Sequence, residues 1–236
     1  MSAAGAPEPA LGGRRSGERV RAAWQPHAPS GVAAPREWAR VAGPNAANGL
    51  LARLHTDTRE AHEDVEHMVD LPASLSSRER YTRLVARFHG FHAAFEPAVS
   101  RSLDDERFLG PRRKLALLRA DLLALGFSDA QAAALSTPSL PPVPSRSAAL
   151  GWLYVIEGST LGGAVIARRA ERQLGLTAAT GCAYFRSYGD AVGAMWTAFR
   201  AYAEAGVPSP EHEAAVQAAR LAFACLQTWL QEGAAA

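Results

Sequence analysis

GWLYVIEGSTLGGAVIARR, residues 151–169, is the stretch that decides the fold, because it is apolar enough to be buried yet carries three glycines in its middle. An interior glycine weakens a helix by roughly 0.5–1 kcal/mol relative to alanine, so three of them need a structural reason. Gly158 and Gly162 are four residues apart and share one helix face, which Gly163 widens. The stretch predicts a kinked helix with a bare face, on which a flat ligand rests against the backbone.

The composition is that of a globular protein with a full hydrophobic core. The chain has 236 residues, 48% of them hydrophobic, and a net charge of only +2, which gives no reason to expect a nucleic-acid partner. No apolar run reaches the ~18 residues of a membrane-spanning helix. The two cysteines, Cys182 and Cys225, do not indicate a disulfide framework or a metal cluster. We therefore expect a reduced, cytoplasmic protein that does not bind membranes.

The beginning of the chain differs in composition from the rest. It holds six of the fifteen prolines, and six arginines against three glutamates give it a charge of about +3. It shows no helical period and no apolar core of a secretory signal. We expect residues 1–47 to be a disordered basic tail and residues 48–236 to form a single domain.

From residue 48 the apolar pattern is helical. Apolar residues recur at spacings of three and four from Leu51 to Val69, and a second helix follows a cap at Ser76 or Ser77. Further helices are expected from Pro111 to Gly126, over 129–135, through the glycine-bearing stretch to Leu174 before Gly175, over 188–205, and from Ser209 to about Leu230. With no period-2 strand, the predicted fold class is all-α, a single-domain bundle of about six or seven helices.

His62 is the first candidate for metal binding. It lies on the apolar face of the first long helix, a position that by itself also fits a hydrogen-bonded core histidine. His55 lies about 20° away around the same helix, whereas His67 points elsewhere. Glu66, one turn after His62, is placed to accept a hydrogen bond from the ring, which would fix the tautomer of a metal-bound imidazole.

The histidine and the glycine stretch together fit a planar macrocycle with a metal at its centre. Such a ligand needs an axial donor on one side and a close wall on the other. His62 is the expected donor, and the three glycines are the expected wall, which carries no histidine or cysteine to block the sixth coordination position. Glu157 and Ser159 are the nearest polar residues, and Ser159 is expected to help hold water there.

A carboxylate-bridged di-iron site is an alternative use of other histidines. His89 and His92 are three residues apart on the second helix, a spacing compatible with a shared metal, and Glu96 follows. However, Glu157 is the only obvious carboxylate in the glycine-bearing helix, and no Glu-x-x-His pair repeats. The pattern therefore disfavours this alternative.

Two motifs resemble those of heme oxygenases. Thr58-Arg59-Glu60-Ala61-His62 resembles their proximal-histidine segment, and GSTLGG, residues 158–163, resembles their glycine-rich distal helix about 95 residues later. The run LYVIEGSTLGG, with YGDAVGAMWTAF over 188–199 and the closing AFACLQTWL, is most similar to the bacterial, biliverdin-producing members that accompany bacteriophytochromes. The resemblance covers about residues 48–232.

The resemblance implies a heme sandwiched between a proximal helix and a kinked distal helix. His62 is then the axial ligand of the heme iron, with Glu66 beside it. The distal face is bordered by Gly158, Ser159, Gly162 and Gly163. Heme b is both cofactor and substrate, and O2 with electrons from a ferredoxin-like protein converts it to biliverdin, carbon monoxide and ferrous iron. The biliverdin would supply a bacteriophytochrome.

Two features of the site are left open by the resemblance. Many members have an aspartate where this chain has Ser159, so the route of proton delivery is not defined. The two heme propionates need cationic or hydroxyl partners. Arg200 is the expected partner, with Tyr188, Arg168 and Arg169 as alternatives, and each arginine position also fits a solvated surface.

Two other functions remain open beside the enzyme. A heme carrier or sensor on the same scaffold would bind heme through His62 and leave the ring intact. A helical interaction protein, such as a phytochrome partner, would bind no heme. The interior glycines disfavour the latter, because a protein without a flat ligand has little use for three of them in one buried helix.

Overall fold

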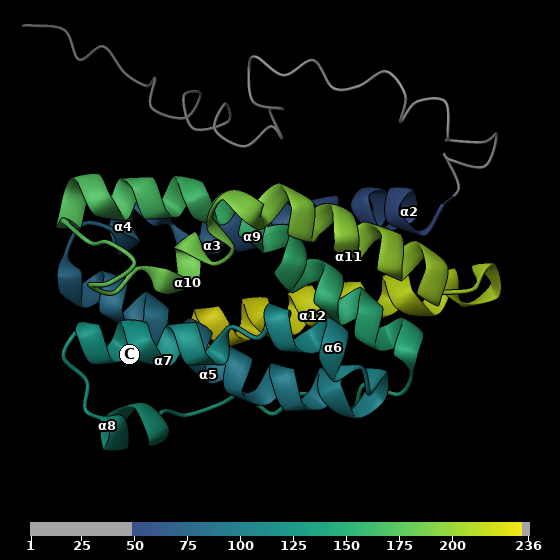
Figure 1. Ribbon diagram of the computed structural model, residues 1–236, viewed down its shortest axis with the longest axis horizontal. Helices are drawn as coiled ribbons and strands as arrows, with labels where there is room; N and C mark the ends of the chain where they lie inside the picture. Colours follow the sequence, from purple (N-terminus) through teal and green to yellow (C-terminus); the bar gives the residue numbers. More distant parts are fainter. Residues whose placement is uncertain (1–48, 233–236) are drawn as a thin grey trace, which may run out of the picture. The chain divides into compact units, whose positions relative to one another are not determined.

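The computed structural model describes residues 49–232, and every regular element in that range is a helix (Figure 1). The elements are α2 (Leu50–Asp57), α3 (Arg59–Val69), α4 (Leu71–Ser74), α5 (Arg78–Leu103), α6 (Glu106–Leu109), η2 (Gly110–Arg112), α7 (Leu115–Ala124), α8 (Asp129–Ala133), α9 (Arg146–Leu174), α10 (Ala183–Arg186), η3 (Gly189–Ala191), α11 (Val192–Gly206), η4 (Ser209–Glu211) and α12 (His212–Glu232). The predicted all-α fold class is confirmed, with more and shorter segments than expected. The predicted tail, residues 1–47, lies outside the described residues.

The first expected helix is divided in two at Thr58. This residue leaves helical geometry at φ −115° and ψ 4°, so that α2 ends before it and α3 begins after it. Its hydroxyl donates to the carbonyl of Leu54 at 2.7 Å, a bond of the kind that bends helices. Leu54 and Thr58 are buried, but α3 itself buries none of its residues.

Local capping chemistry accounts for several helix ends. The Ser77 hydroxyl accepts the backbone N–H of Arg80 at 3.2 Å and begins α5, as predicted. Gly175, with φ 66°, ends α9 as predicted. The expected start of a helix at Pro111 was wrong, because Pro111 lies in the short helix η2 and α7 begins only at Leu115.

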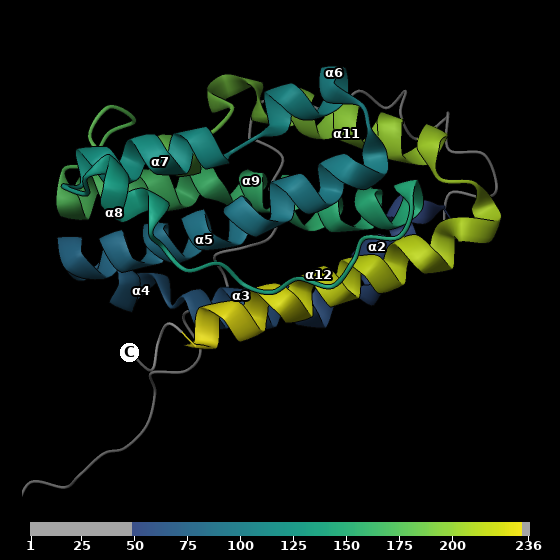
Figure 2. The ribbon, with the colours of Figure 1, turned by 90° about the horizontal axis from the view of Figure 1, so that it is seen from below.

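The other long helices pack around α9. It contacts α5, α10, α11 and α12, and its first half belongs to the larger of two apolar cores. A Cβ atom at Gly151 would lie 2.1 Å from the carbonyl oxygen of Ala215, so this glycine lets α9 and α12 meet backbone to backbone. Figure 2 shows α12 also running alongside α2 and α3. The two helices that carry the predicted motifs, α3 and α9, therefore share α12 as a neighbour.

α9 changes direction near its middle, as Figure 1 shows. The Ser159 hydroxyl donates to the carbonyl of Ile156 at 2.8 Å, and the Thr160 hydroxyl donates to the carbonyl of Glu157 at 2.6 Å. Hydroxyl groups that donate to helix carbonyls in this way favour bending of the helix. The glycines nearby make the backbone easier to bend. The predicted bend thus has a local cause in the sequence GST.

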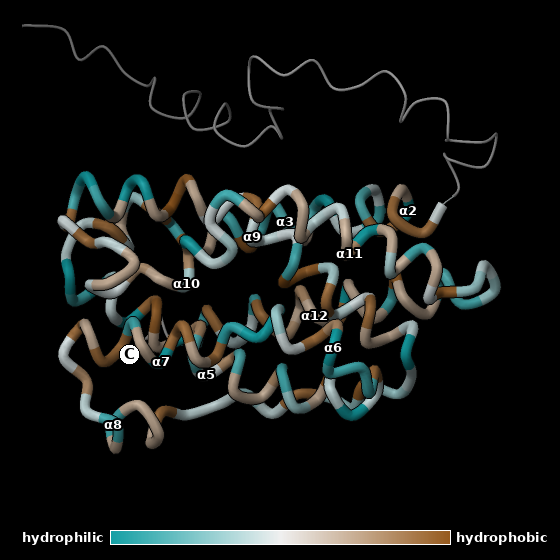
Figure 3. Tube along the Cα trace, in the orientation of Figure 1, coloured by the Kyte–Doolittle hydropathy of each residue, from teal (hydrophilic) through white to brown (hydrophobic). Residues whose placement is uncertain are grey.

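In residues 49–232, α9 is also the one helix long and apolar enough to cross a membrane by length and composition, which the sequence had not led us to expect. Half of its most apolar window is buried inside the fold, as in the core helix of a globular domain. Figure 3 shows hydrophobic and hydrophilic residues alternating along the helices, the pattern of elements with one face toward a core.

Candidate functional site

His62 lies on α3 with its side chain 26% exposed. Its ring meets that of Phe223 on α12 edge to face, with the ring centroids 6.1 Å apart. Burial, more than any nearby charge, lowers the pKa of His62, which favours the neutral imidazole that metals bind. His55 and His67 are exposed, so His62 is the histidine of α2 and α3 that is placed to meet a ligand inside the domain.

Glu66 lies farther from the His62 ring than the helix spacing predicted. Its Oε1 atom is 3.9 Å from Nδ1 of the ring, beyond the range of a hydrogen bond. The two groups attract each other only when the ring is protonated. The role of Glu66 in orienting the imidazole therefore stays a prediction.

Gly158 leaves open space on one face of α9. The nearest described atom to a Cβ placed there would be Cη2 of Trp196, at 3.9 Å. Gly162, one turn later, is half-buried, and Ser159 is exposed. Space beside a bare backbone, with an aromatic ring at van der Waals distance, has the shape and chemistry that suit a flat apolar ligand. The residues present on α9 therefore fit a heme.

Gly163 is required for a different contact. A Cβ atom there would lie 2.6 Å from the carbonyl oxygen of Phe185, which is too close for any side chain. This glycine allows α10 to approach the backbone of α9. The structure thus divides the predicted glycine wall, with Gly158 beside open space and Gly163 inside a packing contact.

Tyr154 connects the two helices that carry the motifs. It lies one turn before Gly158 on α9, and its hydroxyl lies close enough to Thr58, at the joint between α2 and α3, for Thr58 to lower its pKa against the larger effect of burial. Its ring centroid is 5.8 Å from that of Trp196, which stacks on Phe199 at 5.5 Å. The joint of the proximal helix, the distal helix and α11 therefore meet beside the open wall.

Among the residues predicted to hold the propionates, Arg200 has the most suitable surroundings. It is exposed on α11, and its charge acts on Tyr154. Tyr188 is engaged elsewhere, because its hydroxyl donates to Oε1 of Glu157 at 2.6 Å. Arg168 is exposed and Arg169 half-buried in the later part of α9.

A buried ionic cluster next to Gly158 was missed by the sequence analysis. Glu157 is 1% exposed and pairs with Arg112, whose Nε lies 3.4 Å from Oε2. Lys114 is equally buried, with its Nζ 3.5 Å from the centre of the Tyr188 ring. Burial raises the pKa of Glu157 and lowers that of Lys114 to about 8. One signal was available, since Lys114 is the single lysine of the chain beside 24 arginines.

The residues of the di-iron alternative form a hydrogen-bond network instead. His92 Nδ1 lies 3.2 Å from Oε1 of Glu96, and the same oxygen accepts the backbone N–H groups of Lys114 and Leu115 at 2.7 and 2.8 Å. No group of three or more metal-binding side chains exists in the part of the chain that the structure describes. Of the residues in the di-iron alternative, His92 and Glu96 are thus engaged in hydrogen bonds, and residues 49–232 bring no third ligand to them.

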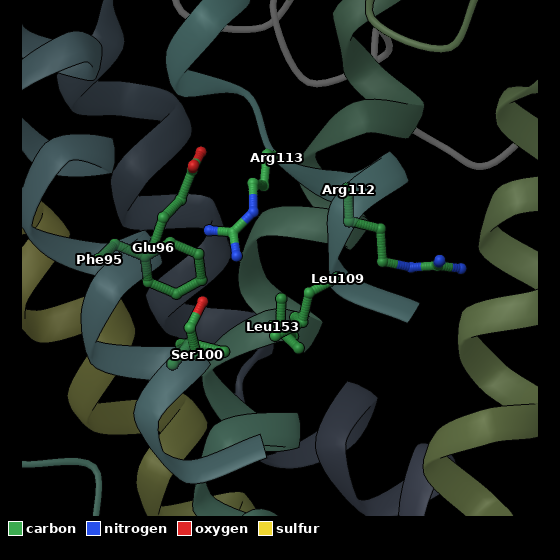
Figure 4. A pocket seen from close by; sticks show the side chains of 8 residues that line it. Phe95, Glu96, Ser100, Leu109, Arg112, Arg113 and Leu153 are labelled. Atoms are coloured by element: carbon green, nitrogen blue, oxygen red, sulfur yellow. The ribbon is translucent and has the colours of Figure 1, made fainter. Parts of the chain in front are cut away.

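A small pocket opens next to the ionic cluster (Figure 4). It is lined by Phe95, Glu96, Val99, Ser100, Leu109, Arg112, Arg113 and Leu153. Figure 4 shows the Arg113 side chain extending toward Phe95 and Glu96, whereas that of Arg112 extends away from them. This direction agrees with the hydrogen bond from Arg112 to the carbonyl of Met195 on α11, at 3.3 Å. The pocket thus leads to Glu96, at the edge of the buried cluster.

Comparison with known proteins shows the family of the chain. The family model "Heme oxygenase" matches residues 48–232. The chain belongs to the heme oxygenase family. It is 36% identical over 158 residues to a heme oxygenase of Xanthomonas campestris pv. campestris, covering 64% of this chain and 89% of the relative. It is 31% identical to heme oxygenase PigA of Pseudomonas aeruginosa over 131 residues, which is 50% of this chain and 59% of PigA.

Solved structures of the family have the same fold. The NO- and CO-bound heme oxygenase of Neisseria meningitidis superposes with a TM-score of 0.65 at 27% identity, covering 78% of this chain and 92% of that one. Heme oxygenase 2 of Chlamydomonas reinhardtii gives a TM-score of 0.64 at 19% identity, over 78% and 96% of the two chains, and shows the fold alone. The family membership identifies the chain as a heme-degrading oxidoreductase with heme as cofactor and substrate.

Proposed function

We propose that this chain opens heme to biliverdin at a site between α3 and α9, with His62 as the axial ligand of the iron. The observation that carries the proposal is the pairing of the half-buried His62 on α3 with the open wall at Gly158 on α9. The approach of Tyr154 on α9 to Thr58 at the start of α3 brings the two helices together near that wall. Heme, when bound, supplies the iron at which O2 is activated.

The residues of the chain position heme and limit water around it. The Phe223 and Trp196 rings provide apolar surface on the His62 side and the Gly158 side. Gly158 and Gly162 let backbone groups approach the distal face closely. Ser159 is the polar side chain at that face, and Arg200 pairs with a propionate at the exposed edge.

An electron donor with an acidic surface, such as a ferredoxin, completes the reaction. Arg168 and Arg172 on α9 and Arg200 on α11 are exposed. Exposed arginines near the proposed edge of the heme favour an acidic protein partner, whose approach they would accelerate by electrostatic steering. The association should therefore weaken as salt is added.

We further propose that the biliverdin supplies a bacteriophytochrome and that the protein is cytoplasmic. Ser159, in place of an aspartate, favours the branch that supplies biliverdin to a bacteriophytochrome. Cys182 and Cys225 are both free thiols, which fits a reducing cytoplasm.

The deciding experiment is an absorption spectrum of the full chain with hemin, before and after addition of ascorbate or of ferredoxin with its reductase. We expect a Soret band that gives way to a broad red bilin band. In His62→Ala the ferric heme spectrum should change and bilin formation should stop. His67→Ala, an exposed histidine of the same helix, is the matched control and should behave like the parent.

Three results would contradict the proposal. A Soret band that survives reductant and air would indicate a heme carrier or sensor. An unchanged spectrum in His62→Ala would transfer the ligand role to another residue, with His55 the first to test. Absence of a Soret band would exclude heme binding altogether.

A further inference from the structure

The buried cluster at Glu157 contains more charge than its own hydrogen bonds satisfy. Nζ of Lys114, Nε of Arg112 and Oε2 of Glu157 are all buried, and none of the three has a hydrogen-bond partner among residues 49–232. Nε of Arg112 and Oε2 of Glu157 attract each other as an ion pair at 3.4 Å, and Nζ of Lys114 contacts the Tyr188 ring, but these contacts leave the hydrogen-bonding capacity of all three atoms unused. Buried polar atoms without a hydrogen bond are costly, so they are retained in few positions. Two donors and one acceptor around one site match the partners that an internal water requires.

Lys114 is the unusual member of the cluster. Its side chain is 1% exposed and its ammonium group lies over the Tyr188 ring, a contact that stabilises the charge without a hydrogen bond. The groups that face it from the surrounding elements are Glu157 on α9, Glu96 and His92 on α5, Arg112 on η2 and Tyr188 before η3. Burial lowers the pKa of Lys114 to about 8, while Glu157 and then Glu96 raise it. Its proton is therefore exchangeable near neutral pH.

Glu157 connects this lysine with the helix of the distal wall. Its carboxyl group accepts the Tyr188 hydroxyl at 2.6 Å, on the same ring that Nζ of Lys114 contacts, and the residue immediately precedes Gly158 on α9. Burial raises the pKa of the carboxyl group. A carboxyl group of raised pKa takes up a proton more readily than an ordinary one, as a proton-transferring residue must.

The pocket of Figure 4 supplies access from solvent to the edge of the cluster. Glu96 and Arg112 both line it. The charges of these two residues act on the buried ammonium of Lys114, and Arg112 also pairs with Glu157, the residue before Gly158. The cluster therefore lies between solvent in the pocket and the wall at Gly158, and it is a candidate for the proton route that Ser159, in place of an aspartate, leaves open.

We propose that Lys114 donates protons through Glu157 to the distal side of the heme site, and that solvent in the pocket at Glu96 restores them. The step is proton transfer alone: an N–H bond of the ammonium breaks, an O–H bond forms on the Glu157 carboxylate, and no electrons move. Glu157 then releases the proton to water on the distal side of the site. The neutral amine of Lys114 takes a replacement proton from water in the pocket. The inference rests on the proposed function.

The first test needs no heme. Because Lys114 is the only lysine, the full chain labelled with 13Cε-lysine gives one lysine resonance, whose pH titration reports this residue alone. We expect a titration with a pKa of about 8, against 10.5 for an ordinary lysine. In Glu157→Gln the pKa should fall further, because the carboxylate that stabilises the ammonium is gone. A lysine that titrates near 10.5, or one unmoved by Glu157→Gln, overturns the proposal.

The second test is the pH profile of hemin conversion. Turnover by the parent should fall as pH rises through about 8, since Lys114 then loses its proton. Lys114→Met should lower turnover at pH 7 by about tenfold or more and remove this descending limb. Arg119→Met, which removes an exposed cation of α7, is the matched control. It should keep the turnover rate of the parent at pH 7 and the fall in turnover above pH 8.

The outcomes separate the two proposals. A parent that binds hemin but never opens the ring overturns the proposed function and this inference with it. A parent that turns over, with a Lys114→Met variant of equal rate and equal pH profile, overturns the inference alone. Melting curves of the variants show that any loss of rate is not a loss of folding.

Discussion

The two helices that border the proposed heme site, α3 and α9, are embedded very differently. α3 buries none of its residues and is flanked by two non-helical joints, Thr58 with φ −115° and Asp70 with φ 35°. α9 is buried along its first half, continues without interruption from Arg146 to Leu174, and meets four other helices. The difference teaches that the helix carrying the glycines is anchored in the core, whereas the helix carrying His62 packs on the outside of it.

The same contrast appears among the glycines of α9. Gly151 and Gly163 are needed because backbone oxygens of neighbouring helices lie where a side chain would be. Gly158 has open space instead. Glycine therefore has two physical roles in this helix, one that fixes the core and one that shapes the site. Substitutions distinguish the two.

The largest effect is expected for Gly151→Val. The new side chain would collide with the carbonyl oxygen of Ala215, 2.1 Å from its Cβ, and force α9 from α12. We expect a loss of about 3 kcal/mol or more in the free energy of unfolding, measured in urea. Gly158→Ala, in the same helix, should change it by less than about 1 kcal/mol. Equal losses in the two variants would remove the distinction between core and site glycines.

The ionic anchoring of α9 should appear in the pH dependence of stability. The pKa of Lys114 is 10.5 in an unfolded chain and about 8 in the folded one. Between these values the unfolded state binds more protons, so this residue makes stability rise with pH from about 8 to 10.5. At about 1.4 kcal/mol per unit, the parent should gain up to about 3 kcal/mol relative to Lys114→Met. A constant difference between the two across this range would contradict the burial of a charged lysine beside α9.

Gly158→Leu should affect the ligand and spare the fold. A Cβ atom at Gly158 meets only Cη2 of Trp196, at ordinary van der Waals distance, so we expect little change in unfolding. We expect hemin affinity reduced by about tenfold or more, because the leucine side chain extends into ligand space. Soret titration measures the affinity. Ala164→Leu, at an exposed position of α9, is the control and should bind as the parent does. Normal affinity in Gly158→Leu would place the ligand elsewhere.

The smallest effect concerns the contact between the two sides. Thr58→Val keeps the shape of the side chain but removes its hydrogen bond to Leu54 and its polar contact with Tyr154. We expect a loss of about 1 kcal/mol in the free energy of unfolding. We also expect faster release of hemin, which is measured by its transfer to apomyoglobin. Thr56→Val, on the exposed side of α2, should change neither. Unaltered release in Thr58→Val would show that the joint does not govern the position of α3.

Features encoded locally could be predicted from the sequence. Ser77 and Gly175 end helices by their own chemistry, and the spacing of apolar residues placed His62 on the inner face of its helix. The break at Thr58 was also local, since its hydroxyl bonds one turn back, but a threonine inside a regular apolar pattern does not indicate it.

Contacts between distant residues could not be predicted. Gly163 belongs to the same motif as Gly158, and only the position of Phe185 shows that its purpose differs. Glu157 and Lys114 are 43 residues apart in sequence, and no periodicity joins them. Their association depends on how η2 and the turn before η3 pack on α9, which is a property of the folded chain.

The lack of buried side chains on α3 has a consequence for hydrogen exchange. Amides of a helix with little burial exchange through local opening, whereas those of α9 exchange only when the core itself opens. The two walls of the site should therefore open in a fixed order, α3 before α9. A ring-opened product would leave by the side that opens first, the one that carries His62.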